Sequence, residues 1–182
     1  MKGLTLIELM ICMALLITFL SVGVPGTHEL IEKYQAQSAV SSLKKILIRS
    51  RMLALEKETT ITICPTKNNT CSENWEGLIS AFTDDNNNLF IDADESVHFH
   101  TELSGSIGYW LKKRAKSPFI KFSPDGHAFS TATTFLYCPT STNLTLAKQL
   151  IINFQGRVRV DNYLNTSGTP YASSRPLACE SS

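Results

Sequence analysis

The stretch "GLTLIELMICMALLITFLSVGVP", residues 3–25, carries a single charged side chain, Glu8, in an otherwise apolar run. Residues 4–24 would span about 31 Å as an α-helix, which is enough to cross the hydrocarbon core of a bilayer. A secretory signal would end in a small-residue cleavage site, but none follows here and Pro25 comes directly after the run. The stretch therefore predicts a membrane-spanning helix that is retained in the protein.

Glu8 is the unusual residue of this run. An ionisable side chain inside a membrane segment costs a few kcal/mol, is a functional-site hypothesis by default, and needs a partner. No other charge lies within the segment. We therefore expect the partner of Glu8 to come from another chain.

Gly3 followed by "LTLIEL" resembles the leader and N-terminal signal of type IV pilins and type II secretion pseudopilins. The resemblance implies cleavage by a prepilin peptidase between Gly3 and Leu4, followed by methylation of the new N-terminus. It also implies that Glu8 pairs with the terminal amine of a neighbouring subunit, and that Pro25 is the family's helix-kinking proline. Most members begin the mature chain with Phe or Met, whereas this chain would begin with Leu4.

The helix is expected to continue beyond Pro25, because a proline kinks rather than ends a helix when neighbouring groups satisfy the freed carbonyl. A stripe at spacings of three and four predicts a second, amphipathic half that ends near Glu58 and packs on a globular domain. The stripe consists of Ala36, Val40, Leu43, Leu47, Ser50 and Ala54. The expected organisation is a leader over 1–3, a transmembrane helix over 4–27, the soluble half of the helix over 28–58 and a globular domain over 59–182.

After Thr59 the sequence changes to short β-like runs separated by turns, of which "SPDG" at 123–126 is the clearest. Strands are expected at 59–64, 78–82, 96–100, 107–112, 119–122, 133–138, 150–154 and 157–160. The fold class is therefore α+β: a pilin fold in which one long N-terminal helix packs on an antiparallel sheet domain. The "FSPDG" turn and the late "GRVR" are similar to the GspH/FimT group of minor pilins and pseudopilins.

Five cysteines are present, one of them, Cys12, in the apolar run. The other four form an even set, which is typical of an oxidising compartment such as the periplasm. Three pairings are possible. We favour Cys64–Cys71, which closes a small loop, and Cys138–Cys179, which fastens the C-terminal tail to the sheet. The absence of a CxxC motif argues against a zinc site.

Charge is distributed unevenly along a chain whose formal net charge is only +1. Residues 1–102 carry eight Lys/Arg and thirteen Asp/Glu, whereas residues 103–182 carry nine and three. Within the basic half, "FQGRVRV" (154–160) alternates, so a strand would place Arg157 and Arg159 on one face and Val158 and Val160, with Phe154, on the core face. Paired arginines suit phosphate, because each planar guanidinium donates two hydrogen bonds at once.

Gly156-Arg157-Val158-Arg159 matches the GRxR motif through which FimT-like minor pilins bind DNA during natural transformation. The resemblance implies sequence-independent, salt-sensitive binding of double-stranded DNA by a minor pilin anchored in the inner membrane and then displayed in a pilus among other pilins. Arg157 and Arg159 would be the primary contacts, and Gly156 belongs to the same DNA-binding motif. Auxiliary contacts are expected from the basic run after Trp110, namely Lys112, Lys113, Arg114 and Lys116, and Tyr109 or Trp110 could stack on bases of a single strand.

Other functions remain open. The arginines could be solvated strand residues or contact a neighbouring pilin, in which case the chain is a structural GspH-like pseudopilin or an assembly-priming minor pilin. "DDNNNLFIDADE" (84–95) matches five positions of a calcium loop, which would suit a third class of function, a calcium-dependent adhesin. It has Leu89 at the glycine position, so an ordinary turn is the simpler interpretation. The four histidines form no recognisable triad or metal spacing, and we expect no catalytic activity, no metal and no cofactor.

Overall fold

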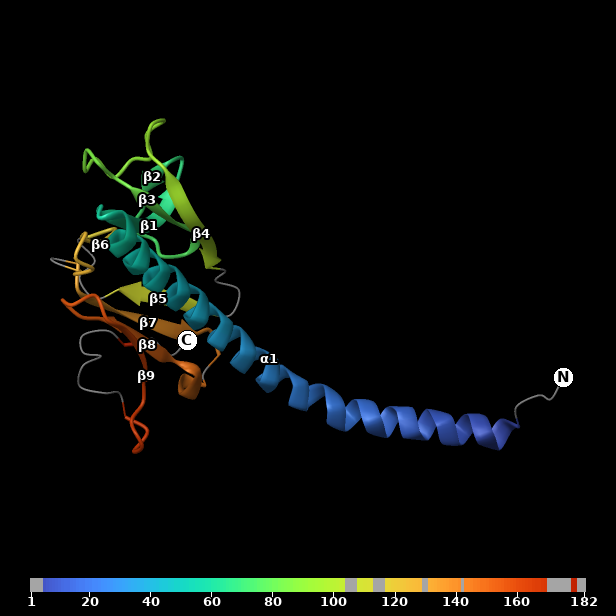
Figure 1. Cartoon of the computed structure of the whole chain (residues 1–182). Helices are drawn as coiled ribbons and strands as arrows, with labels where there is room; N and C mark the ends of the chain where they lie inside the picture. Colours follow the sequence, from blue (N-terminus) through green and yellow to red (C-terminus); the bar gives the residue numbers. More distant parts are fainter. Residues whose placement is uncertain are drawn as a thin grey trace. The chain divides into compact units, whose positions relative to one another are not determined.

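The structure, a computed structural model, describes residues 5–103, 108–112, 117–128, 131–141, 143–169 and 178–179, and only the backbone of residues 20 and 22–26. The chain divides into two compact units, residues 1–35 and residues 36–182. A single helix, α1 (Leu6–Lys57), supplies the first unit and continues into the second (Figure 1). It passes position 25 without interruption and ends one residue before the predicted end.

In the first unit, the apolar side chains of α1 that the structure describes are exposed, from Leu6 to Phe19. Thr5 precedes the helix, and its hydroxyl accepts a hydrogen bond from the backbone N of Glu8 at 3.4 Å. Among the described residues, no helical stretch combines the length and the apolar character that a membrane span requires. This differs from the membrane span expected over 4–27, of which residues 4, 20 and 22–26 are not described to the side chain.

In the second unit, α1 buries the predicted stripe. Ala36, Val40, Leu43, Leu47, Ser50 and Ala54 are all buried, and Ile46 joins them. These residues lie on one face of a 3.6-residue period, so their burial fixes which side of the helix meets the sheets. The helix ends at Lys57, and Glu58 follows with a positive φ of 51°.

The first sheet contains β1 (Ile61–Lys67), β2 (Thr70–Cys71), β3 (Gly77–Thr83), β4 (Val97–Leu103) and β6 (Ile120–Phe122). The strand order is β2-β1-β3-β4, and β6 pairs with the first half of β1. All pairs are antiparallel. Sequence analysis missed β2, because a two-residue strand is too short to show a period.

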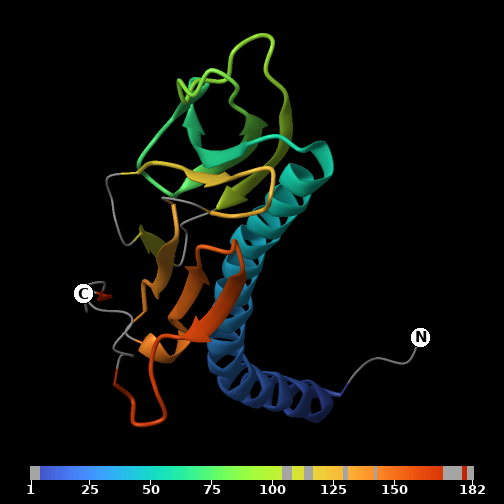
Figure 2. The same ribbon diagram turned by 60° about the vertical axis from the view of Figure 1, so that its left-hand side comes forward.

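The second sheet has the order β5-β7-β8-β9 and is also antiparallel. Its strands are β5 (Gly108–Lys112), β7 (Thr133–Pro139), β8 (Lys148–Ile152) and β9 (Val158–Asn162), with a short 3-10 helix, η1 (Leu144–Leu146), between β7 and β8. All eight predicted strands are present with shifted ends. The second half of α1 runs past both sheets (Figure 2), and one core cluster unites side chains of the helix and both sheets. The fold is the predicted α+β arrangement.

Candidate nucleic-acid interface

Arg157 and Arg159 are both exposed, at the start of β9, which is an edge strand of the second sheet. The two valines that alternate with them, Val158 and Val160, pack against the main core. The alternation predicted from the sequence is therefore present, because a strand directs successive side chains to opposite faces. Both guanidinium groups consequently belong to the outer face of the sheet, away from the core.

The turn that leads into these arginines runs from Asn153 to Arg157. The backbone N of Gly156 donates to the carbonyl of Asn153 at 2.9 Å, and the backbone N of Asn153 donates to the carbonyl of Arg157 at 3.2 Å. The side-chain oxygen of Asn153 accepts a further hydrogen bond from the backbone N of Arg157 at 2.8 Å. Gly156 has a φ of 73°, as is typical of a three-residue hairpin loop with a glycine bulge. The glycine thus sets the position at which β9 begins.

A second turn of the same type, Ser123–His127, lies beside the first. The backbone N of Gly126 donates to the carbonyl of Ser123, and the backbone N of Ala128 donates to the carbonyl of Phe154 at 3.0 Å. Arg51 of α1 joins the two turns: its Nε donates to the carbonyl of Gly126 at 2.8 Å, and one terminal nitrogen donates to the carbonyl of Gln155 at 3.0 Å. A residue on the helix therefore holds the turn that carries the GRVR motif.

Cross-strand pairing places short side chains next to the arginines on the outer face. Arg159 is opposite Ile151, and Ile151 is opposite Thr134. A hollow of about 300 Å³ is lined by Ile151, Asn153, Arg157 and Arg159. The two arginines thus border a hollow whose other lining side chains are shorter than their own. An extended polyanion lying along this hollow could reach both guanidinium groups.

The two arginines differ in their electrostatic surroundings. Nε of Arg159 lies 3.4 Å from a carboxylate oxygen of Asp161, and both side chains are well exposed. An exposed ion pair of this kind is worth about 0–1 kcal/mol, so it does not remove Arg159 from contact with other anions. No ion pair joins Arg157 to the residues that the structure describes. Sequence analysis missed Asp161, although its position two residues after Arg159 on the same strand face could have revealed it.

Phe154 does not lie where the sequence predicted. It was expected on the core face with Val158 and Val160, but 55% of its surface is exposed. That prediction is wrong because Phe154 belongs to the hairpin loop, where the chain reverses, so the period of two does not extend from β9 back to it.

Lys112 does not lie with the arginines either. Its ammonium donates to the carbonyl oxygens of Ser117 and Phe119, the latter at 3.1 Å, and lies 5.2 Å from the centre of the Trp75 ring. Lys112 lies there because it pairs with the buried Phe135 across β5 and β7, so its side chain belongs to the inner face of the sheet. Burial lowers the pKa of Lys112 to about 8. Its predicted role as an auxiliary phosphate contact has no support in this geometry.

The aromatic residues of β5 are divided between the two faces of the second sheet. Trp110 is buried and packs edge-on against Tyr137, at 5.3 Å between ring centres. Tyr109 is half-buried in a second apolar cluster with Leu136 and Cys138. Trp110 is thus a core residue and is not available to stack on a base.

Several predicted site residues lie outside the described part of the chain. They are Gly3, Leu4, Lys113, Arg114 and Lys116. Glu8 is exposed in the first turn of α1, and Pro25 is described by its helical backbone alone.

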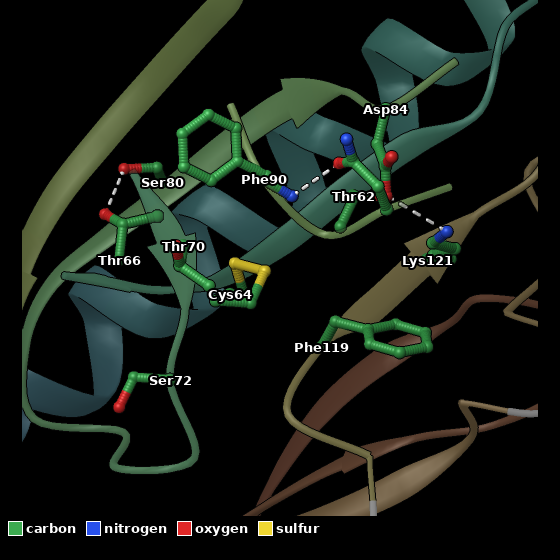
Figure 3. The surroundings of a disulfide bond; sticks show 12 residues. Thr62, Cys64, Thr66, Thr70, Ser72, Ser80, Asp84, Phe90, Phe119 and Lys121 are labelled. Carbon is green, nitrogen blue, oxygen red and sulfur yellow. Dashed lines mark hydrogen bonds and ion pairs between the residues drawn. A yellow bond between two sulfur atoms is a disulfide. The ribbon is translucent and has the colours of Figure 1, made fainter. Parts of the chain in front are cut away.

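Both disulfides of the favoured pairing are present. Cys64 is bonded to Cys71 across a separation of 7 residues, and Cys138 to Cys179 across 41. The first joins β1 to β2 (Figure 3). The second fixes residue 179 to β7, so a residue near the C-terminus is covalently tied to the second sheet.

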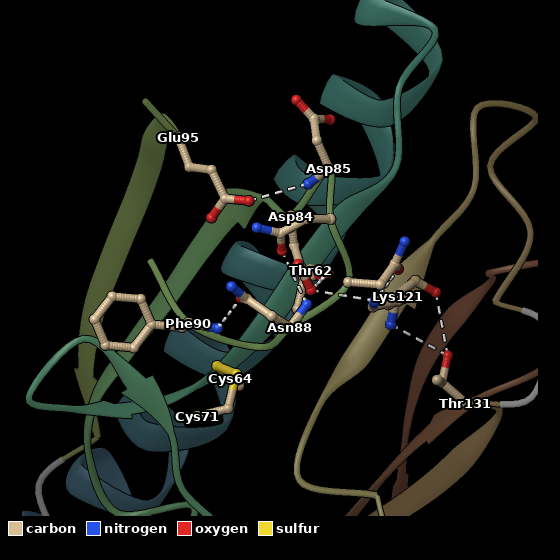
Figure 4. Close-up of polar contacts among 12 residues, drawn as sticks. Thr62, Cys64, Cys71, Asp84, Asp85, Asn88, Phe90, Glu95, Lys121 and Thr131 are labelled. Carbon is tan, nitrogen blue, oxygen red and sulfur yellow. Dashed lines mark hydrogen bonds and ion pairs between the residues drawn. A yellow bond between two sulfur atoms is a disulfide. The ribbon is translucent and has the colours of Figure 1, made fainter. Parts of the chain in front are cut away.

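The loop "DDNNNLFIDADE" is held by its own side chains. The amide nitrogens of Asn86 and Asn88 donate to one carboxylate oxygen of Asp92 at 2.8 and 2.9 Å. The buried carboxylate of Asp84 accepts from Lys121 at 3.2 Å (Figure 4). An internal ammonium therefore already compensates the carboxylate that would begin a calcium loop. In the described ranges, no group of three or more His, Cys, Asp or Glu side chains is arranged to hold a metal ion.

A family model described as "Type II transport protein GspH" matches residues 39–156. Comparison with curated proteins gives no significant match. Two crystal structures of the type IV minor pilin FimU from Pseudomonas aeruginosa are similar, with TM-scores of 0.57 and 0.54 at 20% identity. The alignments cover 78% and 74% of this chain and 97% of each FimU chain. At this identity the likeness concerns the fold.

Proposed function

This chain belongs to the GspH family of minor pilins and pseudopilins, and we propose that it binds double-stranded DNA for uptake in natural transformation. The family and the fold are those of structural proteins without enzymatic activity, in agreement with the sequence analysis. Like other members, the chain associates with further pilins in a pilus or pseudopilus.

The observation that carries the proposal is the pair Arg157 and Arg159. Both are exposed on one face of an edge strand, beside a hollow of about 300 Å³. Two residues of a strand advance about 7 Å, so the guanidinium groups can contact different phosphates of one nucleic-acid strand. Because phosphates carry no sequence information, binding of this kind is independent of sequence and weakens with salt.

The experiment is a titration of fluorescent duplex DNA with the full chain in neutral detergent, followed by fluorescence anisotropy at several salt concentrations. We expect Arg157→Gln/Arg159→Gln to weaken binding at least tenfold at low salt. The control, Lys45→Gln/Lys67→Gln, removes the same charge from two exposed positions elsewhere and should change the Kd less than twofold. Equal weakening by both double variants would remove the assignment of these arginines.

The family description favours a second candidate function, a structural GspH-like pseudopilin or assembly-priming minor pilin. It predicts that the wild-type chain does not retain DNA at any salt concentration. Under this alternative, the face around Arg157 and Arg159 would contact a neighbouring subunit.

Both candidates share the same expected maturation. We propose cleavage by a prepilin peptidase between Gly3 and Leu4, anchoring in the inner membrane before assembly, and pairing of Glu8 with the terminal amine of a neighbouring subunit. Mass spectrometry of the protein from a natural host would test this, because a mature chain beginning at Leu4 is expected. A chain that begins at Met1 would contradict it.

A further inference from the structure

Phe154 is an exposed aromatic residue at the tip of the hairpin that carries the arginines. More than half of its surface is accessible, and its carbonyl is fixed by the backbone N of Ala128. The turn itself is held by Arg51 and Asn153. Phe154 therefore projects from a backbone that is fixed from both sides, so its exposed ring is held in place and is accessible to a ligand.

A second hollow, of about 290 Å³, lies beside Phe154 and is lined also by residues 132–134 and 151–153. It shares Ile151 and Asn153 with the hollow that Arg157 and Arg159 border. The two hollows are thus neighbours on one surface. The first is bordered by the cationic side chains of Arg157 and Arg159, and the second by the phenyl ring of Phe154 together with aliphatic and threonine side chains. A nucleotide needs both, because cationic side chains bind its phosphate and an aromatic ring stacks on its base.

We propose that the hollow beside Phe154 receives an unpaired nucleobase, which stacks on the phenyl ring while Arg157 and Arg159 hold the adjoining phosphates. This inference rests on the proposed function and specifies its substrate further. In a duplex the faces of the bases are covered by their neighbours and unstacking them costs a few kcal/mol per step, so a ring at a hairpin tip stacks most readily on a terminal, frayed or single-stranded base. The site therefore favours DNA with single-stranded ends over blunt duplexes.

The hydrogen bonds of Asn153 explain why the site would not distinguish one base from another. The oxygen of the Asn153 side chain accepts from the backbone N of Arg157, and its nitrogen donates to the side-chain oxygen of Gln155 at 2.6 Å. The side-chain amide of Asn153, which lines both hollows, is thus already hydrogen-bonded within the turn. Stacking on Phe154 alone accepts any base, since every base presents a π-face.

The test compares two fluorescent oligonucleotides of equal length and charge, one of thymidines and one of abasic sites, with the full chain in neutral detergent. We expect Phe154→Ala to weaken binding of the thymidine strand about five- to tenfold and to leave the abasic strand within twofold. Phe154→Tyr should restore binding, because tyrosine keeps the aromatic face. Phe90→Ala, which removes another exposed phenyl ring from the loop that precedes β4, should change neither affinity.

The arginine double variant separates this inference from the function on which it rests. We expect Arg157→Gln/Arg159→Gln to weaken binding of both strands, because both carry phosphates. If it does so and Phe154→Ala alters neither strand, the stacking site is refuted and the DNA-binding function stands. Equal weakening of both strands by Phe154→Ala would also refute stacking, because it would show that Phe154 only supports the turn.

Discussion

The side chain of Arg51 fills the space that a side chain on Gly156 would need. A Cβ atom built on Gly156 would lie 2.7 Å from Nε of Arg51 and 2.1 Å from the carbonyl oxygen of Gly126. Distances under 3 Å between such atoms are not tolerated without movement of the backbone. The glycine of the GRVR motif is therefore a packing requirement of the two joined turns, and the arginines that follow depend on it for their position.

Replacing Gly156 by alanine should destabilise the protein by about 3 kcal/mol or more, because a positive φ costs an alanine about 1–2 kcal/mol and the steric conflict adds to it. Gly168→Ala is a matched control, since Gly168 has nearly the same φ, 72°, in a turn of the same type. A Cβ atom on Gly168 would have no neighbour within 4 Å. Urea unfolding followed by tryptophan fluorescence measures both changes, and equal losses would show that the steric conflict of the added Cβ with Gly126 and Arg51 is unimportant.

Replacing Arg51 by glutamine should loosen both turns. Hydrogen bonds from a charged donor contribute about 1.5–3 kcal/mol, so we expect a loss of roughly 2 kcal/mol and a several-fold weaker affinity for DNA. Hydrogen exchange at the amides of Gly126 and Gly156 should accelerate, because these amides close the two turns.

Arg49→Gln is the control for this change. Arg49 precedes Arg51 by two residues on α1, and its guanidinium lies 4.2 Å from the centre of the Phe99 ring in the first sheet. Its loss should leave the exchange of both glycine amides unaltered. Faster exchange in both variants would indicate general destabilisation rather than a specific role of Arg51.

Local patterns predicted most of the fold, because its main signals lie within single elements. The buried stripe of α1, the strands and the exposed pair Arg157 and Arg159 all follow from periods of 3.6 or 2. The contacts of Arg51 do not, since they join residues 75 and 104 positions apart. No local pattern in the helix marks Arg51 as different from Arg49.

The position of Lys112 could not be predicted from the basic run after Trp110 for a related reason. Lys112 was grouped with its basic neighbours, but strand alternation places it opposite the buried Phe135. Two carbonyl acceptors and an aromatic ring receive its ammonium there. The two acceptors are backbone carbonyls of Ser117 and Phe119, and the amino-acid composition of the basic run does not indicate that they bind this ammonium.

Lys112 should make stability depend on pH. Burial lowers its pKa from 10.5 to about 8, so between pH 8 and 10.5 the unfolded chain binds the proton that the folded chain has released. Stability must then rise with pH in this window, by at most about 3 kcal/mol. We expect the unfolding free energy of the wild type to increase relative to that of Lys112→Met from pH 8 to pH 10. A constant difference would show that the carbonyl contacts keep the lysine charged in the folded protein.

Asp161 should oppose DNA binding, because its carboxylate lies beside Arg159 and repels phosphate. Asp161→Asn removes that charge while keeping the shape of the side chain, so we expect a two- to fivefold lower Kd for DNA at low salt. The gain should shrink as salt is added, since exposed charges are screened. Glu73→Gln changes the net charge equally at an exposed position after β2 and should have less effect. Weaker binding by Asp161→Asn would instead mean that the carboxylate orients Arg159 toward the phosphate.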